Sequence, residues 1–246
     1  MPFPSLEPMQ IAWSVGVLLF AYFIRGIAGF GSALIAVPLL AFFLPVPKIL
    51  PIIALLDWIA STSQGLPHRR LISWPDLLPL LPFSAVGIVS GLLLHAMLDG
   101  RILSIALALF ILGYAIYALL PLPALRGGRG YAAPAGFFGG LIGALFGTGG
   151  PPYVVYLTLR QLDKNQFRAT VATIFVIDGF CRITAFALAG YYTWPVLATC
   201  AVLLPVELLA LRLGGRMHLS ISHQGFVRLV SCILLGSGIS LLVKAF

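Results

Sequence analysis

The chain has 246 residues, of which 60% are hydrophobic and only 9% are charged. This composition excludes an ordinary soluble domain and indicates an all-α polytopic membrane protein held in a lipid bilayer. The net charge is +8, which in a soluble protein would suggest a nucleic-acid partner. Here most bases lie at the ends of apolar segments, so we interpret them as topology signals and expect no nucleic acid.

Ten apolar segments follow one another along the chain, and each is expected to be helical. The second segment of each half is short. Its roughly 14 or 11 residues would reach only about 21 or 16 Å, less than the hydrocarbon core of about 30 Å. The first two segments of each half (9–45 and 132–161) are therefore expected to form hairpins or broken helices rather than two clean spans. The choice between re-entrant hairpins and pairs of full spans stays open. The segments lie near 9–27, 32–45, 49–66, 75–97, 101–120, 132–146, 151–161, 167–190, 195–213 and 224–244.

Glycine-rich breaks separate the first two segments of each half. A break inside hydrocarbon is costly unless protein or a water-lined cavity covers it. The N–H groups at the start of the following helix favour an anion, and proline suits that first turn. These breaks predict a substrate site for an anion; a tight helix crossing or a plain loop is the alternative. The candidate residues are Gly29, Phe30, Gly31, Ser32, Gly147, Thr148, Gly149, Gly150 and Pro151.

The two halves of the chain repeat one another. Gly29–Ser32 aligns with Gly147–Gly150 at an offset of 118 residues, and Asp57 aligns with Asp178 at 121. We therefore predict two membrane repeats, 1–125 and 126–246, within one integral membrane domain. Further matched pairs are Trp74 with Trp194, Pro82 with Pro205, Gly91 with Gly214, His95 with His218 and Gly113 with Gly236.

The distribution of bases predicts the orientation. If the loop with Arg69 is cytoplasmic, nine bases fall inside and three outside, a positive-inside bias. Each repeat then crosses the membrane an odd number of times, so the repeats are inverted. Inverted repeats whose interrupted helices meet near the midplane are typical of secondary transporters. The loops expected in the cytoplasm are Arg69–Arg70, Arg126–Arg129, Arg160–Arg168 and Arg212–Arg216.

Several charged residues lie inside apolar segments, where they are costly and usually functional. Arg25 precedes the first break, and Arg182 lies four residues after Asp178 on the same helix face. Asp178 and Arg182 form either a self-neutralising ion pair or part of a site. Asp57 has no base four residues away, so it is expected to pair with a distant arginine or to carry a proton. Glu207 is a further buried acid, for which a functional role is less expected.

With these two glycine-rich breaks, the chain resembles the TauE/SafE family of sulfite and organosulfonate exporters and permeases. The resemblance extends over essentially the whole chain and includes Arg168-Ala169-Thr170 and the Pro38-Leu39-Leu40 run. The first break differs from the second in having Gly31-Ser32 where the second has Gly149-Gly150. The resemblance implies a transporter of a small anion, such as sulfite, a sulfonate or a carbon–sulfur acid, in the inner membrane.

The sequence therefore predicts a secondary transporter of a small sulfur-containing or carboxylate anion. Arg25 and Arg182 are expected to balance the charge of the anion, and Asp57 or Asp178 to carry a coupling proton. The principal alternative is an anion channel that shares the site but lacks coupling. Neither an enzyme nor a purely structural protein is favoured, and no catalytic residue, metal or cofactor is expected. The direction of transport and the oligomeric state, a homodimer included, stay open.

Overall fold

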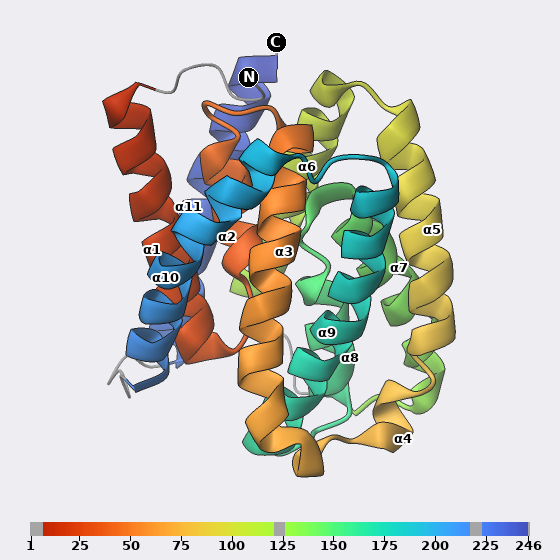
Figure 1. Cartoon of the computed structure of the whole chain (residues 1–246). Helices are drawn as coiled ribbons and strands as arrows, with labels where there is room; N and C mark the ends of the chain where they lie inside the picture. Colours follow the sequence, from red (N-terminus) through yellow and green to blue (C-terminus); the bar gives the residue numbers. More distant parts are fainter. Residues whose placement is uncertain (1–6, 121–125, 217–222, 246) are drawn as a thin grey trace. The chain divides into compact units, whose positions relative to one another are not determined.

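The computed structural model describes residues 7–120, 126–216 and 223–245, with the side chains at 66–68, 223–229 and 245 excepted. Every regular element in this part of the chain is helical (Figure 1), which confirms the all-α part of the predicted fold class. The α-helices are α1 (Pro8–Ala28), α2 (Ser32–Leu40), α3 (Val46–Gly65), α4 (Trp74–Leu77), α5 (Leu81–Met97), α6 (Gly100–Leu119), α7 (Ala132–Phe146), α8 (Gly150–Leu159), α9 (Lys164–Leu188), α10 (Trp194–Arg216) and α11 (His223–Ala245). Two 3₁₀ turns, η1 (Leu66–Leu71) and η2 (Arg129–Tyr131), join them.

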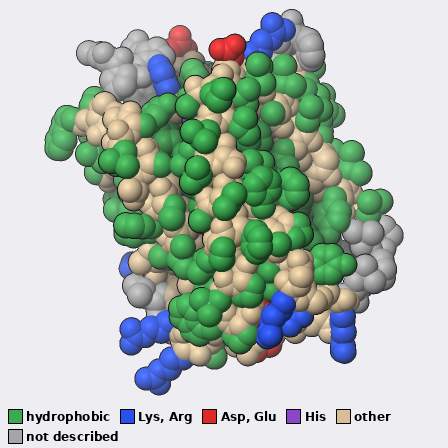
Figure 2. All heavy atoms as spheres, turned by 90° about the vertical axis from the view of Figure 1, so that its right-hand side faces the viewer, with side chains coloured by type: hydrophobic (Ala, Val, Ile, Leu, Met, Phe, Trp, Pro, Cys, Tyr) green, Lys and Arg blue, Asp and Glu red, His purple; other side chains and the backbone are tan. Residues whose placement is uncertain are grey.

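Five helices in the described residues are long and apolar enough to cross a membrane: α1, α3, α6, α9 and α10. Shorter apolar helices lie at Leu81–Met97 and Val230–Lys244. Figure 2 shows the face that α5 presents, where hydrophobic side chains cover the middle and Lys and Arg gather at the lower edge. Along α5, the large exposed apolar side chains recur every three or four residues, as on a lipid-facing helix; they include Phe83, Val86, Val89, Leu93 and Met97.

Both predicted breaks interrupt a helix. At the first, Gly29 and Gly31 adopt φ values of 87° and 96° between α1 and α2. At the second, Gly147 has φ 74° between α7 and α8. These left-handed conformations cost little only for glycine. With nine and ten residues, α2 and α8 reach roughly 14 and 15 Å, about half the hydrocarbon core.

One predicted segment, 75–97, divides into two helices. The short α4 ends at Leu77 and α5 begins at Leu81. Pro79 lies between them, and its missing N–H group and ring prevent a continuous helix. The hydrogen bond from Leu80 N–H to the Leu77 carbonyl, 3.0 Å long, tightens the turn. This turn sets α4 apart from the apolar helix that follows it.

The chain divides into two compact units, and each takes helices from both halves of the sequence. The first contains residues 1–52, 98–122 and 194–246, and the second contains residues 53–97 and 123–193. In the first unit α1 packs along α10, and α6 along α11. In the second unit α5 packs along α7, and α9 contacts α5, α7 and α8.

Glycines allow the closest helix pairs to approach. In the second unit, a Cβ atom at Gly91 of α5 would lie 2.6 Å from the Leu141 carbonyl oxygen and 2.8 Å from Ala144 Cβ, both on α7. In the first unit, a Cβ atom at Gly214 of α10 would strike the Phe23 carbonyl oxygen of α1 and lie 3.2 Å from Gly26 Cα.

These two contacts involve equivalent positions in the two halves of the sequence. Gly91 and Gly214 differ by 123 residues, the offset of the fourth segment of each half. The residues that they approach also correspond. Leu141 and Phe23 are 118 positions apart in the sequence, as are Ala144 and Gly26, and 118 is the offset of the breaks. The first helix of each half thus packs against the fourth segment of the other half through the same positions.

Candidate functional site

The second break is built around the last turn of α7. Gly147 closes the helix by donating its N–H to the Gly143 carbonyl, 2.9 Å away. Thr148 follows immediately and is 3% exposed, and its Oγ1 has no hydrogen-bond partner among the described residues. A buried hydroxyl without a partner is unfavourable. It therefore marks Thr148 as a residue that can bind a polar ligand.

Close packing also accounts for two glycines at this break. A Cβ atom at Gly149 would strike the Gly139 carbonyl oxygen and lie 2.9 Å from Gly143 Cα, both on α7. A Cβ atom at Gly139 would in turn strike the ring of Tyr153. These glycines therefore let α8 fold back against α7, the tight crossing that the sequence left open. A side chain at Gly149 would disrupt this packing whether or not the break binds a ligand.

Helix α9 brings Arg182 to the same turn. Its Nη1 donates to the Gly143 carbonyl at 3.2 Å, the oxygen that also accepts from Gly147. The Arg182 side chain is buried, with the residue 5% exposed, and its Nε has no hydrogen-bond partner among the described residues. A guanidinium has five N–H donors, so Arg182 keeps donors for a further acceptor at the break.

Asp178 does not bind Arg182 directly. Its two carboxyl oxygens accept hydrogen bonds from Ser84 Oγ of α5 at 2.6 Å and from Tyr153 OH of α8 at 2.5 Å. The two hydroxyls are themselves 2.9 Å apart. Among the described residues no oxygen of Asp178 lies within 4.0 Å of an Arg182 nitrogen. The four-residue spacing thus places both charges on one helix face without joining them.

Sequence reasoning missed Ser84 and Tyr153. Serine and tyrosine occur in many membrane helices, and neither is costly enough to attract attention alone. The repeat offered one signal for Ser84. At the offset of 123 it aligns with Glu207, so both halves place a polar residue there. Glu207 is itself 1% exposed, on α10 of the first unit.

The first break also carries an arginine. Arg25 is 2% exposed, and its Nη1 donates to Ser32 Oγ at 2.9 Å. Ser32 begins α2, whose first intrahelical bond runs from Ile35 N–H to the Gly31 carbonyl at 3.3 Å. The N–H groups of Ala33 and Leu34 precede that bond, so they are helix donors that α2 itself does not use. Phe30, the other predicted residue here, is half-buried.

The two arginines reach their breaks from different helices. Arg25 aligns with Gly143 at the offset of 118, and Gly143 is the residue whose carbonyl accepts from Arg182. Arg182 aligns with Ser61, which bonds back to the Asp57 carbonyl of its own helix at 2.7 Å. Asp57 is 7% exposed, and its predicted charge partner stays a prediction.

A second polar cluster lies at one end of the second unit, outside the long apolar helices. Asp76 of α4 accepts from Ser73 Oγ and Arg160 Nε, each at 2.8 Å, and from Arg129 Nε at 3.5 Å. Arg160 Nη1 also donates to the Gly127 carbonyl at 2.7 Å. Burial alone would raise the pKa of Asp76, but the hydrogen bonds from Arg160, Ser73 and Arg129 hold that pKa below its ordinary value. The cluster joins α4, the link before α7 and the end of α8.

Comparison with known proteins identifies the family. A family model described as sulfite exporter TauE/SafE matches residues 14–241. The "Probable sulfite/organosulfonate exporter TauE" of Cupriavidus necator is 25% identical over 231 residues, 91% of this chain and 90% of the relative. The "Probable inner membrane transporter protein TsaS" of Comamonas testosteroni is 30% identical over 207 residues, 77% and 81% of the two chains. No solved structure matches significantly. The matched region includes both helix breaks, and the chain belongs to the sulfite exporter TauE/SafE family.

Proposed function

We propose that this protein is a secondary transporter of a small sulfur-containing or carboxylate anion across the inner membrane. The carrying observation is the buried Arg182 guanidinium at the α7–α8 break, which has no carboxylate at ion-pair distance among the described residues. A buried charge without such a partner is costly. An anionic substrate would neutralise it, which is the reason for assigning the substrate to this break.

The donors at this break suit an oxyanion. The Arg182 fork matches two oxygens of a sulfite, sulfonate or carboxylate group. The Thr148 hydroxyl and the N–H groups of Gly149 and Gly150 would add further donors. The N-terminus of α8 contributes the positive end of its dipole, although Pro151 and the following proline remove two N–H groups from its first turn. The family description and the name of the Cupriavidus necator relative agree with an anionic sulfur substrate.

We extend the proposal to the first break, where the N–H groups of Ala33 and Leu34 at the start of α2 lie beside the buried Arg25. Arg25 already donates a hydrogen bond to the Ser32 side chain. At the second break, Arg182 donates only to a backbone carbonyl and keeps further N–H donors for a ligand. Substitution at the second break is therefore expected to weaken substrate binding more than substitution at the first.

Transport in proteoliposomes tests the assignment. Uptake of labelled sulfite and of a sulfonate is measured for the wild type, Arg182→Lys, Thr148→Val and a control, Thr184→Val. Thr184 is a suitable control because its exposed hydroxyl donates a hydrogen bond to the Phe180 carbonyl of its own helix, 2.8 Å away. Arg182→Lys keeps the charge but loses the fork, so KM should rise on the order of tenfold, about 1.4 kcal/mol. Unchanged uptake by both Arg182→Lys and Thr148→Val would refute the site.

The same vesicles separate a transporter from an anion channel. A proton-coupled transporter accumulates the anion against its own gradient when a pH difference is imposed. A channel only dissipates the anion gradient and gives single-channel currents. If uptake does not depend on the pH difference and single-channel currents are seen, the protein is an anion channel that uses the same residues and not a transporter.

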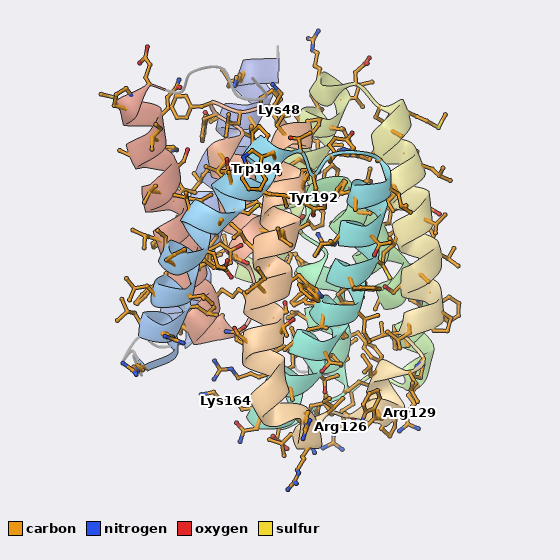
Figure 3. The ribbon with its side chains drawn as sticks, viewed as in Figure 1. Lys48, Arg126, Arg129, Lys164, Tyr192 and Trp194 are labelled. Carbon is orange, nitrogen blue, oxygen red and sulfur yellow. The ribbon has the colours of Figure 1, made fainter. Side chains whose placement is uncertain are left out.

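We also propose that the two repeats are inverted in the membrane. The equivalent helix contacts at Gly91 and Gly214 support a repeat at the level of packing. In the second unit, Arg126, Arg129 and Lys164 lie at the end opposite Tyr192 (Figure 3), as expected if these loops are cytoplasmic. Single cysteines placed at these loops should be labelled by an impermeant thiol reagent from the cytoplasmic side alone.

A further inference from the structure

The side chains of Ser84, Tyr153 and Asp178, contributed by three helices, form a closed triangle of oxygen–oxygen contacts. The three contacts are 2.6 Å (Ser84–Asp178), 2.5 Å (Tyr153–Asp178) and 2.9 Å (Ser84–Tyr153). Each distance lies within the range of an O–H···O hydrogen bond. Ser84 is 2% exposed, Tyr153 is fully buried and Asp178 is 3% exposed, so water has little access to replace any of these bonds.

Counting hydrogens distinguishes the two protonation states of this triangle. Each hydroxyl carries one hydrogen and an ionised carboxylate carries none. With Asp178 ionised, two hydrogens must serve three oxygen–oxygen contacts, and one contact has no hydrogen between its atoms. A protonated carboxyl supplies the third. Asp178 then donates to Tyr153, Tyr153 donates to Ser84, and Ser84 donates to the other Asp178 oxygen.

We propose that Ser84, Tyr153 and Asp178 form a proton-binding site in which the bound proton completes a ring of three hydrogen bonds. Loading forms one O–H bond at Asp178, with the proton taken from water, and release returns the proton to water. The role of this proton in coupling rests on the proposed transport function. The proposed site adds Ser84 and Tyr153, the two hydroxyl residues that position the proton.

The surroundings of Asp178 fit such a site. Arg182, on the same helix, is the charge that acts on it, and Tyr153 and Cys181 are its titratable neighbours. From α3 the uncharged Trp58 packs against Gly179. Among the described residues, α5 and α7 bring no charge to the triangle either: α5 contributes the Ser84 hydroxyl, and α7 approaches the Tyr153 ring with Gly139, which has no side chain.

Tyr153 connects this site to the second break. It lies in the first turn of α8, three residues after Gly150, and its ring rests on Gly139 of α7. When Asp178 loses its proton, the ring of three hydrogen bonds is broken. The Tyr153 hydroxyl can then donate either to the Asp178 carboxylate or to the Ser84 oxygen, but not to both. The hydrogen bonds that hold the start of α8 therefore depend on whether Asp178 is protonated.

Infrared spectroscopy of the purified protein tests the proton site without any substrate. A protonated carboxyl has a carbonyl stretch separate from the carboxylate bands. We expect a band of this kind that titrates with pH and is absent in Asp178→Asn. In Tyr153→Phe and in Ser84→Ala it should persist at higher frequency, because the carboxyl loses a hydrogen-bond partner. Tyr156→Phe is the matched control, since the Tyr156 hydroxyl has no partner among the described residues, and it should leave the band unchanged.

Flux measurements test the use of the proton. Asp178→Asn and Tyr153→Phe should lose anion accumulation driven by a pH difference, while the control Tyr156→Phe should retain it. A missing acid band, or a band that neither hydroxyl variant moves, would overturn the proton site. If the wild type carries no sulfur anion while the band behaves as described, the proposed substrate is wrong and the proton site stands.

Discussion

The two buried arginines at the breaks differ in the groups to which they donate hydrogen bonds. Arg25 and Arg182 are both buried, but Arg25 donates to a side chain of the next helix and Arg182 to a backbone carbonyl. Neither a hydroxyl nor a carbonyl compensates the charge of a guanidinium, whereas a nearby carboxylate would. Arg182 has no carboxylate at ion-pair distance among the described residues, so its charge is one that an anion can balance.

At the residue scale, Asp76 gives a prediction on pH. Because the pKa of Asp76 is lowered in the folded protein, its ionised form contributes stability above the pKa of the unfolded chain. That stability is lost as pH falls through the folded pKa. The contribution should be below about 1 kcal/mol, since Arg129 is half exposed and solvent screens the pair. Thermal unfolding in detergent should show the acid-side loss in the wild type and not in Asp76→Asn. An identical pH profile in both proteins would contradict the assignment.

Sequence reasoning located the charged residues at this scale and not their hydroxyl partners. Arg25, Asp57, Asp178 and Arg182 stand out because a charge in an apolar segment needs a reason. The bond from Asp178 to Tyr153 depends on how α8 folds back on α7, which the local sequence does not specify. The sequence therefore indicated the carboxyl but could not choose between an ion pair with Arg182 and another set of partners.

The helices illustrate what apolar length and glycine placement determine. The two short helices and both breaks follow from segment length and from glycine at left-handed positions. The division of 75–97 was missed because Pro79 was read as part of a continuous apolar segment. The close pairing of α5 with α7 was also beyond prediction, because glycine in a membrane helix does not reveal which helix approaches it.

Glycine-to-valine substitutions test this packing at the element scale. Gly91→Val and Gly214→Val should each destabilise the protein, because the new side chain meets the backbone of α7 or α1. Overpacking of this kind costs on the order of 1–3 kcal/mol. The matched control is Gly113→Val, where a Cβ atom meets nothing within 4 Å. Urea or thermal unfolding in detergent measures the difference. Equal stability of Gly91→Val and Gly113→Val would contradict the proposed packing.

At the scale of the whole molecule, each compact unit combines helices from both halves of the sequence. Each unit holds the first two helices of one half and the fourth segment of the other, so the predicted repeats, 1–125 and 126–246, exchange helices as they pack. The equivalent contacts of Gly91 and Gly214 follow the sequence offsets. Periodicity and matching residues predict the repeat; the distribution of its helices over the two units requires tertiary contacts that no single sequence displays.

At this scale the breaks are expected to determine the function, and ligand binding is the most direct measurement of it. Thermal unfolding of the purified protein is followed with sulfite, a sulfonate, sulfate and simple carboxylates. A ligand that binds only the folded state adds about 2.7 kcal/mol at a hundredfold excess over Kd. We predict stabilisation by a sulfur oxyanion that is lost in Arg182→Ala and Thr148→Val and retained in Thr184→Val. Full stabilisation of Arg182→Ala by the same anion would contradict the assignment of the substrate to the α7–α8 break.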